Sequence, residues 1–135
     1  MKKVVIGIIS KIDTDGIKKW LLVSASKDFG KFNGYYYPPG GHIEKGESES
    51  IALSREIKEE LNLDAKPLKR IAISPGDVPD QETYWWLCDV SGKIKRDSEL
   101  TDAQYFTKEQ IDSSIKIWPA TRKIFEKYIF ERSDK

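Results

Sequence analysis

The chain contains few of the residues from which disulfides and histidine-based sites are built. Its 135 residues include one cysteine, one histidine and one methionine. A single cysteine, Cys88, cannot form an internal disulfide, which is compatible with a reducing compartment. The single histidine, His42, excludes a metal or catalytic cluster made of several histidines. We therefore expect a cytoplasmic protein whose chemistry is carried by other side chains.

Two further absences narrow the class of protein. No apolar run approaches the length of a membrane span, and the basic start leads into a β-branched run that is unlike a signal peptide. The net charge is +1, with 23 basic and 22 acidic residues, whereas a broad nucleic-acid-binding surface would be strongly basic. We expect no membrane association and no nucleic-acid polymer as partner. A small nucleotide is compatible with this balance.

Hydrophobic periodicity predicts strands on both sides of one long helix. Residues 48–61 lack glycine and proline and predict that helix, and Pro119 suits the first turn of a closing helix. Asn33 and Gly34 indicate a hairpin turn. The runs that predict strands are residues 4–9, 20–23, 35–37, 68–73, 83–90 and 104–106. We expect an α/β fold in which residues 1–135 form a single domain, with a mixed β-sheet between helical layers.

The segment of residues 41–63, GHIEKGESESIALSREIKEELNL, concentrates carboxylates. At about 100° per residue, Glu56, Glu59 and Glu60 fall within one helical sector about 100° wide. These like charges repel one another unless a cation lies between them, and their hard oxygen ligands suit magnesium or manganese. A solvated acidic helix face is the alternative, and the carboxylate pattern alone does not separate the two.

Other residues of the segment fit the same helix. Ser48 and Ser50 are candidate N-caps, and Asn62 can adopt the left-handed conformation that ends a helix. The apolar residues on the adjacent sector are Leu53, Ile57 and Leu61. They would anchor the helix to a core, so that the carboxylates are carried on a helix with one buried face.

The segment resembles the signature of the Nudix hydrolases, G-x5-E-x7-R-E-U-x-E-E-x-G-U, in which U is a bulky aliphatic residue. The positions on pattern are Gly41, Glu47, Arg55, Glu56, Ile57, Glu59, Glu60 and Leu63. The departure is Asn62, where the family has glycine. Asparagine is the next-best residue for that backbone conformation, so the change bears on geometry more than on chemistry. The order of elements around the signature agrees with the family's α/β/α sandwich.

The resemblance implies hydrolysis of a nucleoside diphosphate linked to another moiety. One or more Mg²⁺ ions, with Mn²⁺ as the alternative, would neutralise the phosphate oxygens and acidify the attacking water. The family pattern assigns metal binding to Glu56, Glu59 and Glu60. A backbone carbonyl of the glycine turn, near Gly40 or Gly41, would add a ligand.

The resemblance also implies catalytic roles for Glu47, Arg55, Glu56 and Glu59. Arg55 would orient Glu56 through a charge-assisted hydrogen bond, and Glu47 would support the arginine or the metal shell. The general base stays open among Glu56, Glu59 and an acid outside the signature. Glu99 is the candidate for that outside acid, and a glutamate on a loop surface is the alternative interpretation of the same residue.

Substrate choice depends on aromatic residues. Tyr36, together with Trp85 or Trp86, is a candidate to flank a nucleobase, Trp86 being our choice of the two. Because alternate side chains of a strand face opposite ways, core packing is the alternative for each. The family's small MutT-like members make a (d)NTP pyrophosphohydrolase our first hypothesis. An ADP-ribose or nucleotide-sugar pyrophosphatase and a non-catalytic nucleotide sensor are the alternatives, and a homodimer would fit the family.

Overall fold

The computed structural model describes residues 1–26, 30–77 and 79–130. The strands and helices follow one another as β1 (Lys2–Ile12), β2 (Lys18–Ala25), a 3₁₀ turn (Gly30–Phe32), β3 (Gly40–His42), α1 (Glu49–Leu61), β4 (Asp64–Pro75), β5 (Gln81–Ser91), β6 (Leu100–Thr107), a π-helical turn (Gln110–Ser114), α2 (Pro119–Ile124) and a second π-helical segment (Phe125–Phe130). None of the helices in these residues is long and apolar enough to cross a membrane.

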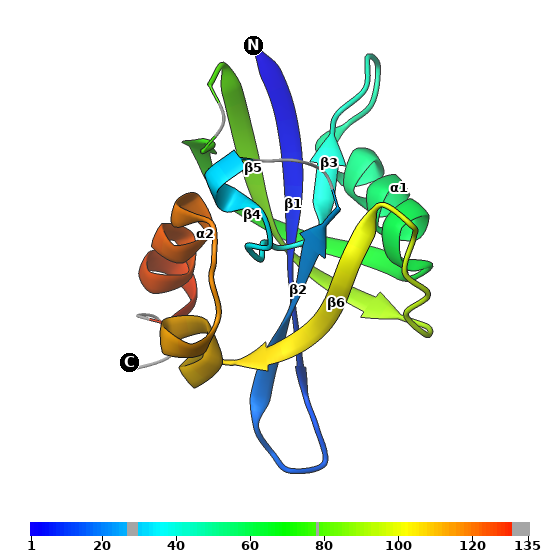
Figure 1. The fold of residues 1–135 in the computed structure, drawn as a ribbon. Helices are drawn as coiled ribbons and strands as arrows, with labels where there is room; N and C mark the ends of the chain where they lie inside the picture. Colours follow the sequence, from blue (N-terminus) through cyan, green and yellow to red (C-terminus); the bar gives the residue numbers. More distant parts are fainter. Residues whose placement is uncertain (27–29, 78, 131–135) are drawn as a thin grey trace.

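Strand β1 organises the sheet, whose strand order is β4-β5-β1-β2-β6. Residues 2–9 of β1 run parallel to β5, and residues 4–6 also pair antiparallel with β3. Only residues 10–12 pair with β2, which continues antiparallel to β6. The sheet is therefore mixed, as the sequence predicts, and β2 with β6 diverges from β4 with β5 (Figure 1).

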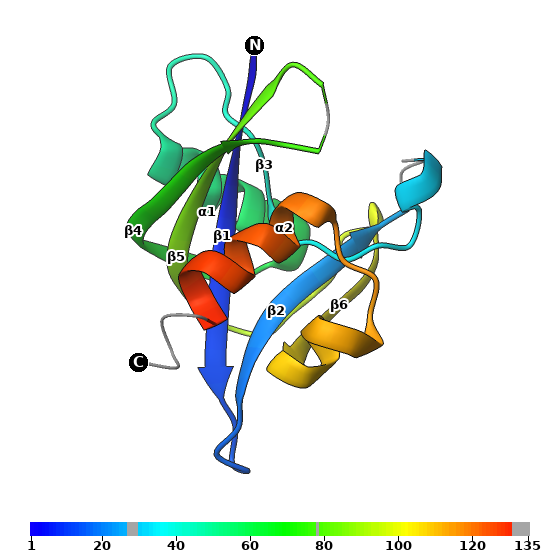
Figure 2. The same cartoon turned by 90° about the vertical axis from the view of Figure 1, so that its left-hand side faces the viewer.

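Alternate side chains of β1 enter two different cores. Val4, Ile6 and Ile8 pack in a cluster with residues of the C-terminal helical segments. Val5 and Ile9 pack in a second cluster with the buried face of α1. Figure 2, turned to face α2, shows α2 in front of the sheet and α1 behind it. The predicted α/β/α sandwich is confirmed. Its physical reason is that a strand with apolar residues on both faces requires a helical layer on each side.

Gly7 is the point where α1 lies against the centre of the sheet. A Cβ atom at this position would lie 3.2 Å from Leu53 Cδ1 and 3.3 Å from Ile57 Cδ1. Both leucine and isoleucine are fully buried. The missing side chain of Gly7 thus lets the helix that carries the carboxylates pack directly on β1.

Two predictions for the segment before α1 are wrong. Tyr36 and Tyr37 form isolated bridges and no regular strand, because the two prolines that follow lack the N–H groups a ladder needs. Asn33 and Gly34 close a turn, in which the Tyr35 N–H donates to the Phe32 carbonyl at 3.1 Å, directly after the 3₁₀ turn. In the part of this segment that the structure describes, no hairpin forms between paired strands. The glycine turn, in contrast, extends into a short strand, β3.

Helix α1 begins and ends at the predicted residues. The Ser48 hydroxyl accepts a hydrogen bond from the Ile51 N–H at 3.2 Å, which is a standard N-cap contact. Asn62 is left-handed, with φ 59° and ψ 27°, and its N–H donates to the Lys58 carbonyl. The asparagine that departs from the Nudix signature therefore adopts the conformation for which the family uses glycine.

We predict that Asn62→Ala lowers the free energy of unfolding by about 1–2 kcal/mol. The β-carbon of alanine is strained in the left-handed region, and alanine has no polar side chain that could form a local hydrogen bond to offset this strain. Asn62→Gly is the matched variant and should stay within about 0.5 kcal/mol of the wild type. Urea unfolding followed by circular dichroism measures both. Equal losses in the two variants would show that backbone conformation at this position is not what matters.

Candidate metal and catalytic site

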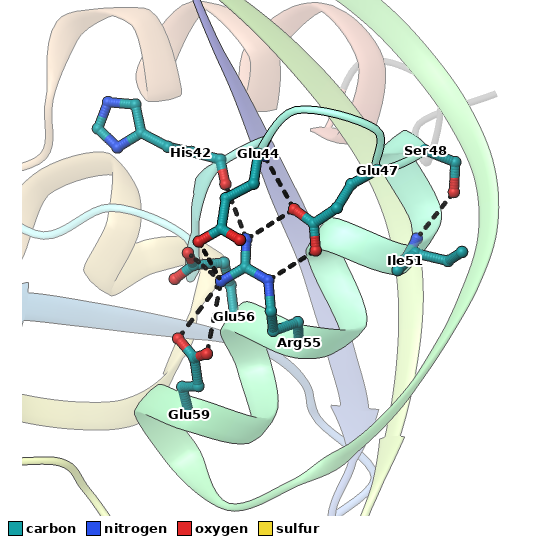
Figure 3. Close-up of polar contacts among 8 residues, drawn as sticks. All are labelled: His42, Glu44, Glu47, Ser48, Ile51, Arg55, Glu56 and Glu59. Atoms are coloured by element: carbon teal, nitrogen blue, oxygen red, sulfur yellow. Dashed lines mark hydrogen bonds and ion pairs between the residues drawn. The ribbon is translucent and has the colours of Figure 1, made fainter.

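Arg55 is the centre of the polar cluster on α1 (Figure 3). Its Nε and Nη2 atoms donate to the two carboxylate oxygens of Glu47 at 2.7 and 2.8 Å. Its Nη1 atom donates to Glu56 Oε1 at 3.0 Å and lies 3.4 Å from Glu59 Oε2. One guanidinium thus brings together three of the acids that the sequence predicts for the site. Their chemical roles stay predictions.

Glu47 is held in the best-defined ion pair of the cluster. Besides the two-pronged contact with Arg55, it accepts a hydrogen bond from the Glu44 N–H at 2.8 Å. The hydrogen bond from Arg55, helped by that of Glu44, lowers the pKa of Glu47 to about 2. A carboxylate with so low a pKa is a weak proton acceptor near neutral pH. The geometry therefore favours a positioning role for Glu47 over a role as general base.

Arg55 also ties the helix to the strand that precedes it. Its Nη2 atom donates to the backbone carbonyl of His42 at 3.1 Å, and His42 ends β3. The guanidinium therefore fixes the distance between β3 and the carboxylates of α1. Figure 3 shows the His42 imidazole directed away from Arg55, so the histidine contributes its backbone and not its ring to this contact.

Glu56 packs directly against the glycine of the signature. A Cβ atom at Gly41 would lie 2.4 Å from both the carboxyl carbon and Oε2 of Glu56. Burial raises the pKa of Glu56 above its ordinary value, and the hydrogen bond from Arg55 acts in the opposite direction. The physical need for glycine at position 41 is thus the close approach of this carboxylate to the backbone of β3.

Glu60 carries the clearest sign of a missing positive charge. Within the described residues its Oε2 atom is buried and has no hydrogen-bond partner. Burial raises the pKa of Glu60 to about 8, the charge of Glu56 adds to the increase, and a hydrogen bond from the Gly40 backbone opposes it. A buried carboxylate oxygen without a partner is costly unless a proton or a cation satisfies it. This oxygen therefore fits a divalent cation.

The acids face a common region but are not gathered around one point. In the part of the chain that the structure describes, no group of three aspartate, glutamate, histidine or cysteine side chains is already arranged to hold a metal ion. Arg55 accounts for this, because it draws Glu56 and Glu59 to itself. Binding of a cation would require those two carboxylates to turn from the guanidinium toward the ion. Their oxygen-only chemistry suits Mg²⁺ or Mn²⁺.

The loop between β5 and β6 brings Glu99 toward the same place. Its backbone wraps the end of α1, with the Asp97 N–H donating to the Glu60 carbonyl at 2.8 Å and the Lys95 N–H donating to the Leu61 carbonyl at 2.9 Å. The charges of Glu99 and Asp97 both contribute to the raised pKa of Glu60. Glu99 therefore lies in the electrostatic range of the signature, although it is 39 residues further along the chain.

Two neighbours of Glu60 escape the sequence analysis. Asp97 belongs to the polar loop just described, and no spacing rule connects it to the signature. Tyr37 packs edge-on against the Trp118 ring, with centroids 6.3 Å apart. Burial raises the pKa of Tyr37 well above its usual value, and the charges of Glu60 and Glu99 add to this. Their nearness to the site follows from tertiary packing, so no sequence signal identifies them.

The structure does not bring Tyr36 and Trp86 together. The Tyr36 hydroxyl hydrogen-bonds the Asp102 carboxylate, and its ring packs in the core on the α2 side. Trp86 donates from Nε1 to Glu49 Oε1 at 2.8 Å and packs in the core on the α1 side. Because the two side chains lie on opposite faces of the sheet, they do not flank one base. Trp85, the other candidate, is buried in the core.

Residues 1–128 match the NUDIX domain family. The NAD-capped RNA hydrolase NudC of Haemophilus influenzae is 32% identical over 92 residues, which cover 67% of this chain and 35% of NudC. The human NAD-capped RNA hydrolase NUDT12 is 35% identical over 83 residues, which cover 56% of this chain and 18% of NUDT12. The matched part of this chain thus spans about a third or less of the length of these relatives.

Among solved structures, that of the E. coli ORF135 protein superimposes with a TM-score of 0.76 at 23% identity, covering 100% of this chain and 93% of that one. A fold match at this identity shows a shared architecture. Nudix hydrolases generally use divalent metals, in agreement with the carboxylate chemistry of α1. The family match over nearly the whole chain, with the sandwich fold around it, shows that this protein belongs to the Nudix family.

Proposed function

We propose that this protein hydrolyses a phosphoanhydride bond of a nucleoside diphosphate linked to another moiety, with Mg²⁺ as cofactor. The observation that carries the proposal is the buried, unpartnered Glu60 oxygen beside the acids of α1. Our preferred substrates are (d)NTPs, which would yield a nucleoside monophosphate and pyrophosphate. Mn²⁺ is the second candidate cofactor.

Some residues of the chain would bind the cation, and others would position the residues that bind it. Glu56, Glu59 and Glu60 would hold the cation, together with a backbone carbonyl at Gly40 or Gly41. When bound, the cation would neutralise charge on the phosphate oxygens and acidify the attacking water. Arg55 would keep the carboxylates of α1 in place through the contacts described above.

The proton acceptor is proposed from among three acids. Glu56 and Glu59 lie on the helix itself, and Glu99 approaches Glu60 from the loop before β6. The raised pKa of Glu56 makes it a stronger base than Glu47, whose pKa is held near 2 by Arg55. This contrast supports Glu56 or an acid near it as the group that takes the proton from water.

A second candidate substrate is a capped RNA or another dinucleotide pyrophosphate. The observation that favours it is the match to NudC, which is an NAD-capped RNA hydrolase. This match is a reason to question our expectation that no nucleic-acid polymer is a partner, because the substrate of NudC is an RNA. Capped RNA therefore belongs among the substrates to be tested. ADP-ribose and nucleotide sugars stay alternatives, as does a nucleotide sensor without turnover, and a homodimer stays a proposal.

We predict magnesium-dependent turnover of one substrate group in a panel of canonical and oxidised (d)NTPs, ADP-ribose, nucleotide sugars, dinucleoside polyphosphates and NAD-capped oligonucleotides. Phosphate release, with added pyrophosphatase or phosphatase to separate the products, identifies the cleaved bond. Removal of Mg²⁺ by EDTA should abolish turnover, because the proposed mechanism needs the cation to neutralise the phosphate oxygens and acidify the attacking water. Tight nucleotide binding without turnover of any substrate would replace the hydrolase with the sensor.

We predict that Glu56→Gln retains the fold and nucleotide binding but lowers kcat by roughly 10²–10⁴-fold, the range that general acid–base and ligand losses produce. Glu126→Gln is the matched control, since Glu126 is an exposed acid of the C-terminal segment. Steady-state kinetics and circular dichroism measure both variants. Unchanged turnover in Glu56→Gln would remove this residue from the mechanism.

We predict that the metal-free protein loses stability as the pH rises from about 4.5 to about 8, the ordinary and the folded-state pKa of Glu60. A raised carboxyl pKa stabilises the fold while the group is protonated, and this stabilisation is lost as the folded group ionises. The decline, on the order of a few kcal/mol, should be smaller in Glu60→Gln and smaller with Mg²⁺ present. Urea unfolding in EDTA across this pH range is the measurement. An equal slope in Glu60→Gln would assign the decline to other groups.

A further inference from the structure

A second charged feature adjoins Glu47. It is a cavity of about 380 Å³ between the start of β1 and the loop that joins β3 to α1. Its charged and polar lining consists of Lys2, Lys3, His42, Glu44, Lys45 and Glu47. We call it the lysine cavity.

One acid of the lysine cavity, Glu47, is firmly bound by another cation, and the exposed Glu44 lies near the same cation. Both carboxylate oxygens of Glu47 are bound by Arg55, and Glu44 Oε1 lies 3.7 Å from Arg55 Nη1. Within the described ranges, by contrast, no carboxylate forms an ion pair with Lys2, Lys3 or Lys45. The positive charge of the cavity is therefore available to an anionic ligand.

The backbone holds the two walls of the cavity in a fixed relation. The Ile43 N–H donates to the Lys3 carbonyl at 2.9 Å, and Val4 pairs with His42 in the β1–β3 ladder. On the loop, the Glu47 N–H donates to the Glu44 carbonyl at 3.0 Å. Lys3 of β1 and Lys45 of the loop thus line one cavity, whose two backbone segments are held together by hydrogen bonds.

The lysine cavity shares residues with the candidate catalytic site. Glu47 lines the cavity and chelates Arg55, whose guanidinium also contacts Glu56. His42 lines the cavity and gives its carbonyl to Arg55. A ligand in the cavity would therefore contact residues that also belong to the cluster of proposed metal ligands.

We propose that the lysine cavity binds a phosphate group of the substrate that lies beyond the cleaved anhydride bond, namely the terminal phosphate of a nucleoside triphosphate. The inference rests on the proposed function. Lysine ammonium groups bind phosphate as point charges, and a volume of about 380 Å³ is near the small end of ligand pockets. The charge of the lysines therefore favours a phosphate over a second, uncharged nucleoside. The cavity would favour triphosphates over ADP-ribose, whose cleavage leaves no further phosphate beyond the reacting pair.

Binding of inorganic tripolyphosphate in EDTA tests the cavity without metal and without turnover. We predict that Lys3→Ala with Lys45→Ala weakens this binding about tenfold or more, since two charge-assisted contacts are lost. The matched control is Lys93→Ala with Lys123→Ala, which removes the same charge from exposed lysines outside the cavity. It should change binding by no more than about twofold. Isothermal titration calorimetry at one salt concentration measures all three proteins.

Kinetics of the same variants test substrate class. In Lys3→Ala with Lys45→Ala, kcat/KM should fall about tenfold or more for nucleoside triphosphates, mostly through KM. For nucleoside diphosphates and ADP-ribose it should change by less than about threefold. An NAD-capped oligonucleotide is tested as an additional substrate. A loss confined to that substrate would overturn the terminal-phosphate assignment and place an RNA phosphate in the cavity.

The outcomes separate this inference from the proposed hydrolase function. If the wild type turns over no substrate but tripolyphosphate binding depends on Lys3 and Lys45, the hydrolase proposal fails and the anion site stands. If the wild type is active but tripolyphosphate does not bind, or both lysine pairs matter equally, the lysine cavity is not a phosphate site. Equal kinetic losses for triphosphates, diphosphates and ADP-ribose would also overturn it.

Discussion

The ion pair between Arg55 and Glu47 is the contact on which the arrangement of the site depends. Several carboxylates share one face of α1, and in isolation they would repel one another. Arg55 offsets that repulsion and, through the His42 carbonyl, sets the spacing between α1 and β3. The glycines at positions 7 and 41 make this spacing attainable, because a side chain at either position would push against the helix or its carboxylate.

A single guanidinium cannot satisfy every acid around it. Arg55 binds Glu47 with two hydrogen bonds and reaches Glu56 and Glu59 with the remaining nitrogen. Glu60 is left with a buried oxygen that has no partner among the described residues. The site therefore carries more negative charge than Arg55 can neutralise. A divalent cation would neutralise the remaining carboxylate charge. The same arrangement binds Glu47 of the lysine cavity through Arg55, while Lys2, Lys3 and Lys45 form no ion pair among the described residues.

The sequence predicts the helix that carries the acids better than it predicts the loops that approach this helix. The helix, its caps, its buried face and the acids on it follow from local spacing, and the structure confirms them from Ser48 to Asn62. The approach of Glu99 and Asp97 does not follow, because it depends on backbone hydrogen bonds between the β5–β6 loop and the last carbonyls of α1, which lie far apart in the sequence. The segment around Tyr36 has the composition of a strand but forms isolated bridges, since the prolines that follow it prevent a ladder.

By itself the sequence determined the local features of this protein: a Nudix signature, an amphipathic helix and strands with apolar residues on both faces. Those features depend on residues a few positions apart, whose relation is set by helix and strand periodicity. Only the tertiary structure decided which side chains meet across the sheet. It separated Tyr36 from Trp86 onto opposite faces and brought Lys3 and Lys45 to the lining of one cavity. The physical reason is that contacts between distant segments depend on strand order and register, which no local pattern specifies.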